Sequence, residues 1–164
     1  DDFHVIAPDW RGHGDSQHAD PPAYSTRHYI DDLHQLLAKI GVERPVLVGH
    51  SMGGHNAVIY ATEHADELAG LVMVDTTVSY PESAVQFLRK LGQKPAKVFA
   101  SRAEAISRFR VLPRESLFSQ ERLEYIAGFA FSQRADGRWV AKLDRRTLFR
   151  EPVDGRRRLA SISC

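Results

Sequence analysis

A short apolar run that ends at a Gly-x-Ser-x-Gly motif is the feature that most constrains how this 164-residue chain folds. Residues 46–54 read VLVGHSMGG, and a helix-compatible stretch continues to His64. The β-branched residues before the motif favour a buried strand. If Ser51 Oγ is to project from the end of a strand, the backbone must bend sharply with a positive φ, at a cost of about 1–3 kcal/mol. The sequence therefore predicts a strand, a strained turn carrying serine, and a helix.

The glycines around Ser51 fit such a turn. Gly49 and Gly53 lie two residues before and after the serine, where side chains would collide. Gly54 allows the helix to pack closely on the strand. The backbone N–H of Met52 lies at the helix start, where the dipole favours developing negative charge. We interpret the segment as a nucleophile elbow; the alternative is a glycine-rich turn with an ordinary exposed serine.

A second motif lies upstream, where residues 9–16 read DWRGHGDS. It resembles the Asp-x-Arg-Gly-x-Gly-x-Ser loop that follows the fourth strand of the α/β-hydrolase family. Together with GHSMGG at 49–54, this motif makes the resemblance specific over residues 3–77. Over residues 78–164 the resemblance is weak. Within that family it is closest to the small esterases, carbon–carbon bond hydrolases and cofactor-free haloperoxidases. The resemblance implies a partial α/β-hydrolase fold, in which a parallel sheet with flanking helices is followed by a helical cap.

The hydrophobic pattern predicts elements that fit an α/β fold. Strands are expected at residues 3–7, 46–49 and 71–74. Helices are expected at 26–40, with Gly41 as the stop, and at 52–64. Strands that alternate with helices imply parallel pairing, and near-continuous apolar strands imply a sheet covered on both faces.

The pattern changes after Thr76. Residues 82–91, 102–111 and 120–132 are expected to be helical, and a strand is possible at 138–143. Residues 154–162 are expected to form a helix that returns to the core, with Asp154 as its N-cap. The expected domains are a partial core at 1–77, a helical cap at 78–150 and a return helix at 151–164.

Charge is divided unevenly along the chain. Residues 1–80 hold four basic and twelve acidic residues, whereas residues 81–164 hold eighteen basic and nine acidic residues. A nucleic-acid partner is one explanation, but the arginines lie among acidic and apolar residues and no aromatic stacking motif accompanies them. We therefore expect a solvated basic cap over an acidic core, no nucleic-acid partner and no membrane span. The single cysteine, Cys164, excludes an internal disulfide.

The histidines indicate what the chain lacks. There are eight, and none lies beyond His64. In this family the order is nucleophile, acid, histidine. His55 and His64 follow Ser51 on the helix that runs away from its Oγ, and loop residue His13 is expected to shape its own turn. The catalytic base is therefore expected outside this chain, which resembles an internal piece of a larger hydrolase running from the fourth strand to just before the seventh.

The other catalytic groups are also incomplete. Asp75 ends the third predicted strand and is a candidate acid; the alternative is a strand-end aspartate that hydrogen-bonds the following turn. An oxyanion hole needs two N–H groups, of which Met52 supplies one. The family resemblance implies that the second comes from a His-Gly turn after the third strand, which is expected before Asp1. His13-Gly14 follows a different strand and is not that turn.

Aromatic residues are candidates for substrate contacts. Trp10 is a candidate for the pocket mouth, with packing under its loop as the alternative. Four further candidates lie later in the chain, namely Phe87, Phe129, Phe131 and Trp139. The alternative for these four is that they form the small hydrophobic core of the cap itself. His13 and His18 lie near aspartates, but loop polarity explains them better than a metal site. We expect no metal and no cofactor.

Together these features predict a serine hydrolase acting on a small molecule, at an ester or at a carbon–carbon bond next to a carbonyl. One alternative is a non-catalytic or slow small-molecule receptor on the same fold. Another is a complete, non-catalytic chain. A cytoplasmic location is expected, and the sequence leaves the substrate and the oligomeric state open.

Overall fold

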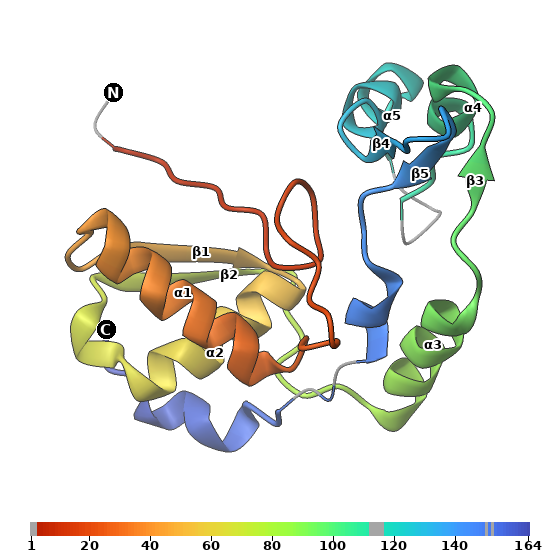
Figure 1. Ribbon diagram of the computed structural model, residues 1–164. Coiled ribbons are helices and arrows are strands. Elements are labelled where there is room, and N and C mark those ends of the chain that lie inside the picture. Colours follow the sequence, from red (N-terminus) through yellow and green to blue (C-terminus); the bar gives the residue numbers. More distant parts are fainter. Residues whose placement is uncertain (1–2, 112–116, 150, 152) are drawn as a thin grey trace. The chain divides into compact units, whose positions relative to one another are not determined.

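The structure is a computed structural model that describes residues 3–111, 117–149, 151 and 153–164. The chain forms two compact units. Residues 23–90 and 148–164 make up the parallel-sheet unit, and residues 1–22 and 91–147 make up the antiparallel-sheet unit (Figure 1). The domain boundaries expected from the sequence stay predictions, and residue 150 lies outside the described residues. Every helix among the described residues is too short or too polar to cross a bilayer.

The parallel-sheet unit contains the elements that the hydrophobic pattern predicts, and also one short 3₁₀ turn that it does not predict. They are α1 (Thr26–Ile40), β1 (Val46–His50), α2 (Met52–Glu63), the 3₁₀ turn η1 (Ala65–Glu67), β2 (Gly70–Val74) and the 3₁₀ helix η3 (Arg156–Ser161). Helix α3 (Glu82–Gln93) begins in this unit. Strands β1 and β2 pair in parallel, from Val46 opposite Gly70 to His50 opposite Val74. The predictions of both strands, their parallel pairing and the intervening helix are confirmed.

Helix α1 has clear signals at both ends. The Ser25 hydroxyl accepts a hydrogen bond from the His28 N–H, and His28 Nδ1 accepts one from the Ser25 N–H. At the other end Gly41 adopts φ 66°, a left-handed conformation that glycine reaches without steric cost. The predicted bounds of this helix are confirmed because capping and periodicity agree.

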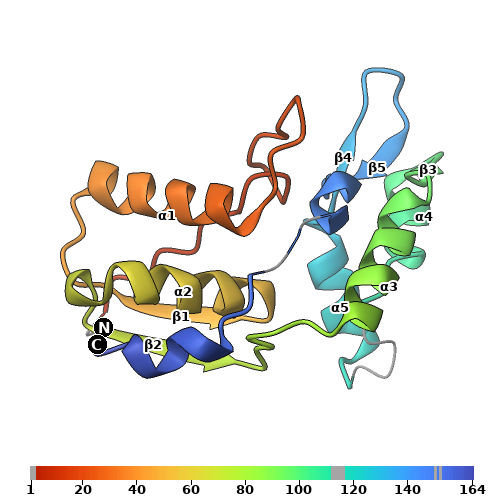
Figure 2. The ribbon, with the colours of Figure 1, turned by 90° about the horizontal axis from the view of Figure 1, so that it is seen from below.

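Helix α2 is the centre of the parallel-sheet unit. It packs on β1 and β2 and also contacts α1 and η3, and the two ribbon views show α1 and η3 on either side of it (Figure 2). All residues from 54 to 61 are buried. The core therefore lies between the sheet and these helices, and it includes Tyr29, Ile30, Val58, Ile59 and Leu68.

The opposite face of the sheet differs from the expectation. Val48 is 69% exposed, and Val46, Val72 and Val74 are exposed too. Among the described residues, helices of this unit cover one face of the sheet and not both. The apolar strands predicted two covered faces because such runs indicate burial, but they do not say which segment supplies the cover.

The third expected strand is absent from the described residues. Residues 3–7 have no strand assignment, and Phe3 and Val5 are almost fully exposed. The parallel sheet therefore has two strands, and the prediction of a strand at 3–7 is wrong for this chain. An apolar, β-branched segment becomes a strand only when a neighbour completes its hydrogen bonds.

The antiparallel-sheet unit combines short strands with short helices. Its sheet has the order β3 (Val98–Phe99), β5 (Trp139–Ala141) and β4 (Phe131–Gln133). Two helices, α4 (Arg102–Ser107) and α5 (Gln120–Ala127), and the 3₁₀ helix η2 (Arg145–Phe149) complete the elements. The strand that was possible at 138–143 is present as β5, but it covers only Trp139–Ala141.

The two helices of this unit are shorter than predicted. A helix is expected over 102–111, but α4 ends at Ser107. A helix is expected over 120–132, but α5 ends at Ala127 and β4 begins at Phe131. Phe131 leaves the helical pattern because it enters the core formed by Phe99, Ala105 and Ala127. Its ring meets the Phe99 ring edge-to-face at 5.6 Å. Tertiary packing therefore overrides helix periodicity here.

The DWRGHGDS loop at residues 9–16 is held by hydrogen bonds between its own side chains and backbone. The Asp9 carboxylate accepts from the Asp15 N–H at 3.0 Å, and the Ser16 hydroxyl donates to the Asp9 carbonyl at 2.7 Å. Gly14 has φ 51°, and a methyl group there would lie 2.0 Å from Asp9 Oδ2. Within the same unit, the Gly12 carbonyl accepts from the Asp144 N–H at 2.8 Å. The acid, glycine and serine positions of the motif therefore have structural roles.

The C-terminal helix is η3, and its N-cap is Gly155 rather than the predicted Asp154. The Gly155 N–H donates to the Val78 carbonyl at 2.8 Å, and a side chain at Gly155 would press on that carbonyl. The Asp154 carboxylate accepts from the Arg156 N–H and pairs with its guanidinium at 2.9 Å. This pair holds the pKa of Asp154 well below its usual range.

Helix α2 comes close to strand β1 at two glycines. A methyl group at Gly49 would lie 2.5 Å from the Gly54 backbone nitrogen. A methyl group at Gly54 would lie 1.9 Å from Thr76 Oγ1 and 2.8 Å from the Gly49 carbonyl oxygen. The close packing predicted for Gly54 is confirmed.

Two isoleucines on α1 test which face of the helix stabilises the unit. Ile30 is 2% exposed and Ile40 is 41% exposed. Ile30→Ala should lower the free energy of unfolding by about 2–5 kcal/mol, because it removes buried methyl groups and leaves a cavity. Ile40→Ala should cost well under half as much. Chemical denaturation compares the two, and equal losses would contradict this packing.

A glycine pair tests the helix–strand contact. Gly54→Ala should destabilise the protein by about 1–3 kcal/mol through overpacking, although alanine favours a helix. Gly70→Ala is the matched control, because the nearest atom to its new methyl group is 3.8 Å away on Val46. The control should be neutral or slightly stabilising. Thermal unfolding measures both, and a Gly54→Ala protein as stable as the wild type would contradict the predicted clash.

Candidate functional site

The turn at Ser51 has the predicted strained geometry. Ser51 has φ 50° and ψ −114°, a conformation that L-residues rarely adopt. Its N–H donates to the Val74 carbonyl at 3.1 Å, and its carbonyl accepts from the His55 N–H at 3.0 Å. The strand next to it and the first turn of α2 thus hold both sides of the bend. The positive φ is confirmed.

The Ser51 hydroxyl is not used to cap its helix. Ser25, Ser101 and Ser119 are also N-cap residues, and each hydroxyl accepts a backbone N–H of its own helix. Ser51 occupies the same position on α2 without a side-chain capping bond, and it is exposed. A serine cap typically contributes about 0.5–2 kcal/mol, so this position forgoes a stabilising contact. The hydroxyl is therefore presented at the surface.

The start of α2 provides a donor beside Ser51. Met52 is the first residue of the helix, and the first turn contains no acidic residue. The N–H groups at a helix start carry a partial positive charge. Because no carboxylate lies in the first turn itself, this end favours an anion or a developing oxyanion. The arrangement suits attack on a carbonyl carbon.

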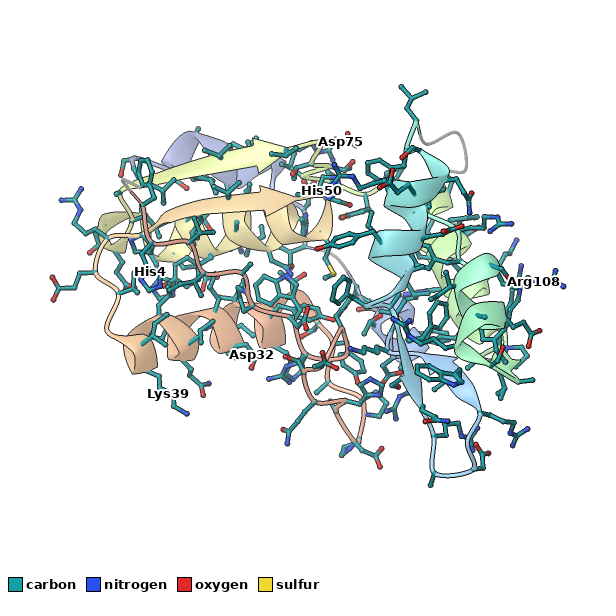
Figure 3. The ribbon with its side chains drawn as sticks, turned by 90° about the horizontal axis from the view of Figure 1, so that it is seen from above. His4, Asp32, Lys39, His50, Asp75 and Arg108 are labelled. Atoms are coloured by element: carbon teal, nitrogen blue, oxygen red, sulfur yellow. The ribbon has the colours of Figure 1, made fainter. Side chains whose placement is uncertain are left out.

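Asp75 lies at the same edge of the sheet. The parallel register places His50 opposite Val74, so Ser51 and Asp75 follow the ends of neighbouring strands. Figure 3 shows His50 and Asp75 at these two strand ends. Asp75 is exposed and has φ 43°. Two adjacent strand ends therefore both carry a non-glycine residue in a strained backbone conformation.

The histidines of the parallel-sheet unit have other surroundings. His55 is buried, with its ring edge-on to Tyr80 at 5.2 Å. His64 Nδ1 is 2.9 Å from Glu67 Oε1, beyond the far end of α2. His28 Nδ1 is 2.7 Å from Ser25 Oγ. In the other unit, His13 Nδ1 is 3.1 Å from the Arg11 carbonyl, which fits a role in shaping that loop.

The aromatic candidates occupy different environments. Phe131 is buried in the core of the antiparallel-sheet unit, and Trp139 packs against it. Phe129 is exposed and meets Tyr125 edge-to-face at 5.3 Å. Phe87 is exposed on α3, and Trp10 is half-buried. Phe131 and Trp139 therefore pack in a hydrophobic core, which is the alternative role given for them above. A substrate contact for any of the five aromatic residues stays a prediction.

One cluster was not singled out from the sequence. His34, His64 and Glu67 each offer a ligand atom, and these atoms lie within 4.8 Å of one another. Their order in the chain conceals this, because His34 is on α1 and the other two follow α2. The detectable signal is His-x-x-Glu at 64–67. The His64 hydrogen bond lowers the pKa of Glu67, and burial together with the Glu67 hydrogen bond raises that of Tyr60.

Comparison with known sequences gives consistent matches. The sequence profile of the alpha/beta hydrolase fold matches residues 1–146. The sn-1-specific diacylglycerol lipase of Mus musculus is 42% identical over 71 residues, which are 43% of this chain and 22% of that protein. The 2-(acetamidomethylene)succinate hydrolase of Mesorhizobium japonicum is 36% identical over 77 residues, which are 47% of this chain and 27% of that protein.

A crystal structure shows the same fold. An alpha/beta hydrolase from Novosphingobium aromaticivorans matches with a TM-score of 0.73 and 25% identity, over 94% of this chain and 58% of that chain. The match thus spans little more than half of that protein, and the sequence matches span about a quarter of the curated relatives. A profile match over most of the chain, on a parallel strand–serine turn–helix unit, shows that the chain belongs to the α/β-hydrolase family.

Proposed function

We propose that the protein containing this chain is a serine hydrolase that cleaves an ester, or a carbon–carbon bond next to a carbonyl, in a small molecule. The observation that carries the proposal is Ser51 itself. Its backbone is strained and its hydroxyl forgoes the capping bond that Ser25, Ser101 and Ser119 all make. Strain and lost capping are typical of a residue positioned for chemistry. The names of the relatives, a lipase and a hydrolase, support hydrolysis.

The proposed reaction begins at the Ser51 hydroxyl. Its oxygen attacks the substrate carbonyl carbon while its proton passes to a histidine. The carbonyl oxygen becomes an oxyanion, and the Met52 N–H stabilises it together with a second backbone N–H. The leaving group departs with a proton returned by the histidine. Water then releases the acyl group from Ser51 by the same steps.

The histidine is proposed to come from a segment outside this chain. His28, His34 and His64 each have a hydrogen-bonding partner away from Ser51, which supports this assignment. Asp75 is the proposed candidate within the chain for orienting that histidine, because it follows the strand next to β1. The second N–H of the oxyanion hole is likewise assigned outside the chain.

Substrate contacts are proposed for the exposed aromatic residues first. Phe87 and Phe129 present their rings to solvent, and Trp10 is half-buried in its loop. Phe131 and Trp139 pack in the core of their own unit, so they are proposed as the second choice for substrate contacts. The chemistry needs no cofactor in this proposal, because the serine, the histidine and backbone N–H groups supply it.

Replacing the nucleophile tests the proposal directly. In the complete protein, Ser51→Ala should lower kcat for a short p-nitrophenyl ester by about 10⁴–10⁶-fold, because no other group forms the acyl intermediate. The same variant should lose rapid labelling by a fluorophosphonate. Absorbance of released p-nitrophenol and in-gel fluorescence measure the two effects.

Ser132→Ala is the control, because Ser132 lies exposed on β4. It should hydrolyse and label like the wild type. Unchanged turnover in Ser51→Ala would remove Ser51 from the mechanism. A wild-type protein that binds a small ligand tightly but neither turns over nor labels would instead be a receptor on this fold.

A further inference from the structure

A polar cluster lies at the end of α2 remote from Ser51. His64 is the C-cap residue of α2, Glu67 closes the following 3₁₀ turn, and His34 reaches them from α1. Helix α2 has 12 residues, so this cluster is about 18 Å along the helix from Ser51. The cluster therefore needs an explanation other than catalysis at the serine.

The distances within the cluster suit ligands of one ion. His64 Nδ1 is 2.9 Å from Glu67 Oε1, and His34 Nδ1 is 3.7 Å from Glu67 Oε2. A tetrahedral Zn²⁺ with ligands at about 2.0–2.1 Å keeps them about 3.3 Å apart. The two observed distances lie on either side of this value, and the three ligand atoms all lie within 4.8 Å of one another. We propose that His34, His64 and Glu67 bind a divalent transition-metal ion, with Zn²⁺ the best match.

The ligand types support this choice of metal. Two imidazole nitrogens and one carboxylate oxygen suit Zn²⁺, whereas Mg²⁺ and Ca²⁺ prefer oxygen ligands. The His34 and His64 rings are stacked with centroids 4.8 Å apart, and the Tyr60 ring stacks on His64 at 4.4 Å. Stacking restricts the rotation of both imidazoles, which lowers the entropy cost of binding an ion.

The surrounding field favours a cation. The cluster lies at the C-terminal end of α2, where the helix dipole is negative. Two arginines near this end of the helix, Arg27 and Arg158, are each paired with Glu63. Their charge is therefore partly offset at the helix end.

Tyr60 positions the carboxylate. Its hydroxyl donates to Glu67 Oε2 at 3.0 Å and lies 3.4 Å from His34 Nδ1. Tyr60 is fully buried, so its ring holds the hydroxyl in place. Groups that orient metal ligands in this way typically contribute about 10–100-fold to metal affinity. Tyr60 is a positioning residue here and not a ligand.

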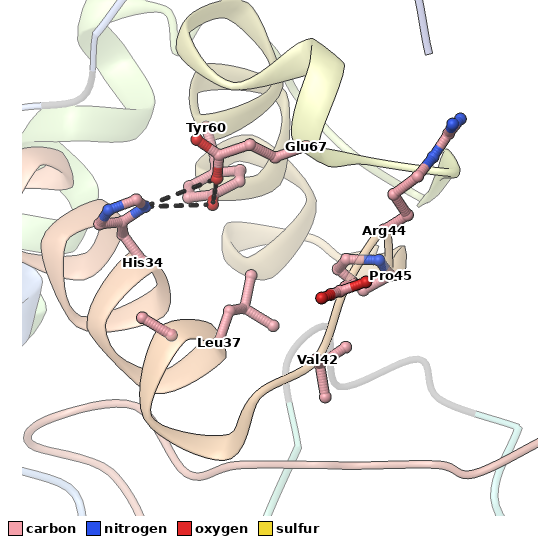
Figure 4. A pocket seen from close by; sticks show the side chains of 9 residues that line it. His34, Leu37, Val42, Arg44, Pro45, Tyr60 and Glu67 are labelled. Carbon is pink, nitrogen blue, oxygen red and sulfur yellow. Dashed lines mark hydrogen bonds and ion pairs between the residues drawn. The ribbon is translucent and has the colours of Figure 1, made fainter.

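A fourth coordination position is available on the pocket side. A pocket of about 360 Å³ adjoins the cluster. Its lining includes His34, Tyr60 and Glu67, the charged residues Glu43 and Arg44, and the apolar residues Leu37, Val42 and Pro45. Figure 4 shows His34, Tyr60 and Glu67 directed toward one another at this pocket. Three protein ligands and one open position fit a site that takes a water molecule or a small ligand. Because His34 is on α1 and the other ligands follow α2, a bound ion links these two segments.

Zinc binding to the metal-stripped complete protein tests the proposal by calorimetry. The wild type should bind one Zn²⁺ per chain at this site, and its unfolding temperature should rise with Zn²⁺. Mg²⁺ should have no such effect. Glu67→Gln keeps the side-chain size and its hydrogen-bonding capacity but loses the charge, and it should weaken Zn²⁺ binding at least tenfold. Tyr60→Phe should weaken it about 10–100-fold.

His34→Gln covers the case in which a buried variant does not fold, because His34 is half exposed. It too should weaken binding at least tenfold. His4→Gln is the matched control at an exposed histidine and should bind like the wild type. The proposal is overturned if the wild type shows neither Zn²⁺ binding nor a change in unfolding temperature. Equal affinity in His34→Gln, Glu67→Gln and the wild type would also overturn it, since the ion would then lie on other groups.

Discussion

The backbone bend at Ser51 is the constraint on which the parallel-sheet unit depends. A residue at φ 50° is held against its preference, and the strain persists only because both neighbours are fixed. One side is fixed by the hydrogen bond to Val74 on β2, and the other by the first turn of α2. The bend in turn requires that β1 and α2 approach closely, which Gly49 and Gly54 permit. Strand pairing, helix packing and serine exposure therefore depend on one another.

Helix α2 transmits this constraint through the unit. Because its start is fixed at the elbow and its sides are buried against β1, β2, α1 and η3, its far end is fixed as well. One end presents N–H groups beside a serine hydroxyl, and the other presents carbonyl groups beside two imidazoles and a carboxylate. The opposite signs of the helix dipole suit an oxyanion at the first end and a cation at the second. A single rigid element thus supports both proposals.

The antiparallel-sheet unit shows where local pattern was insufficient. Residues 120–132 have helical spacing of apolar residues, yet the helix ends at Ala127 and Phe131 joins a strand. The ring of Phe131 contacts Phe99 and Phe109, which are distant in the sequence. The two strands that were not expected, β3 and β4, have only two and three residues, too few side chains to show an alternating pattern. Their positions depend on contacts that periodicity does not record.

The sequence alone determined the features that rest on local chemistry. The strand, the positive φ at Ser51, the glycine contacts and the bounds of α1 all follow from residues within a few positions of one another. Apart from the parallel pairing of β1 with β2, long-range pairing was decided only in the tertiary structure. In that structure residues 3–7 have no strand partner, and the N-cap of η3 is Gly155 rather than the predicted Asp154. His34 also lies close to His64 and Glu67, which are distant from it in the chain. The physical reason is that local preferences are set by neighbouring residues, whereas partners distant in the chain are selected by the packing of the whole unit.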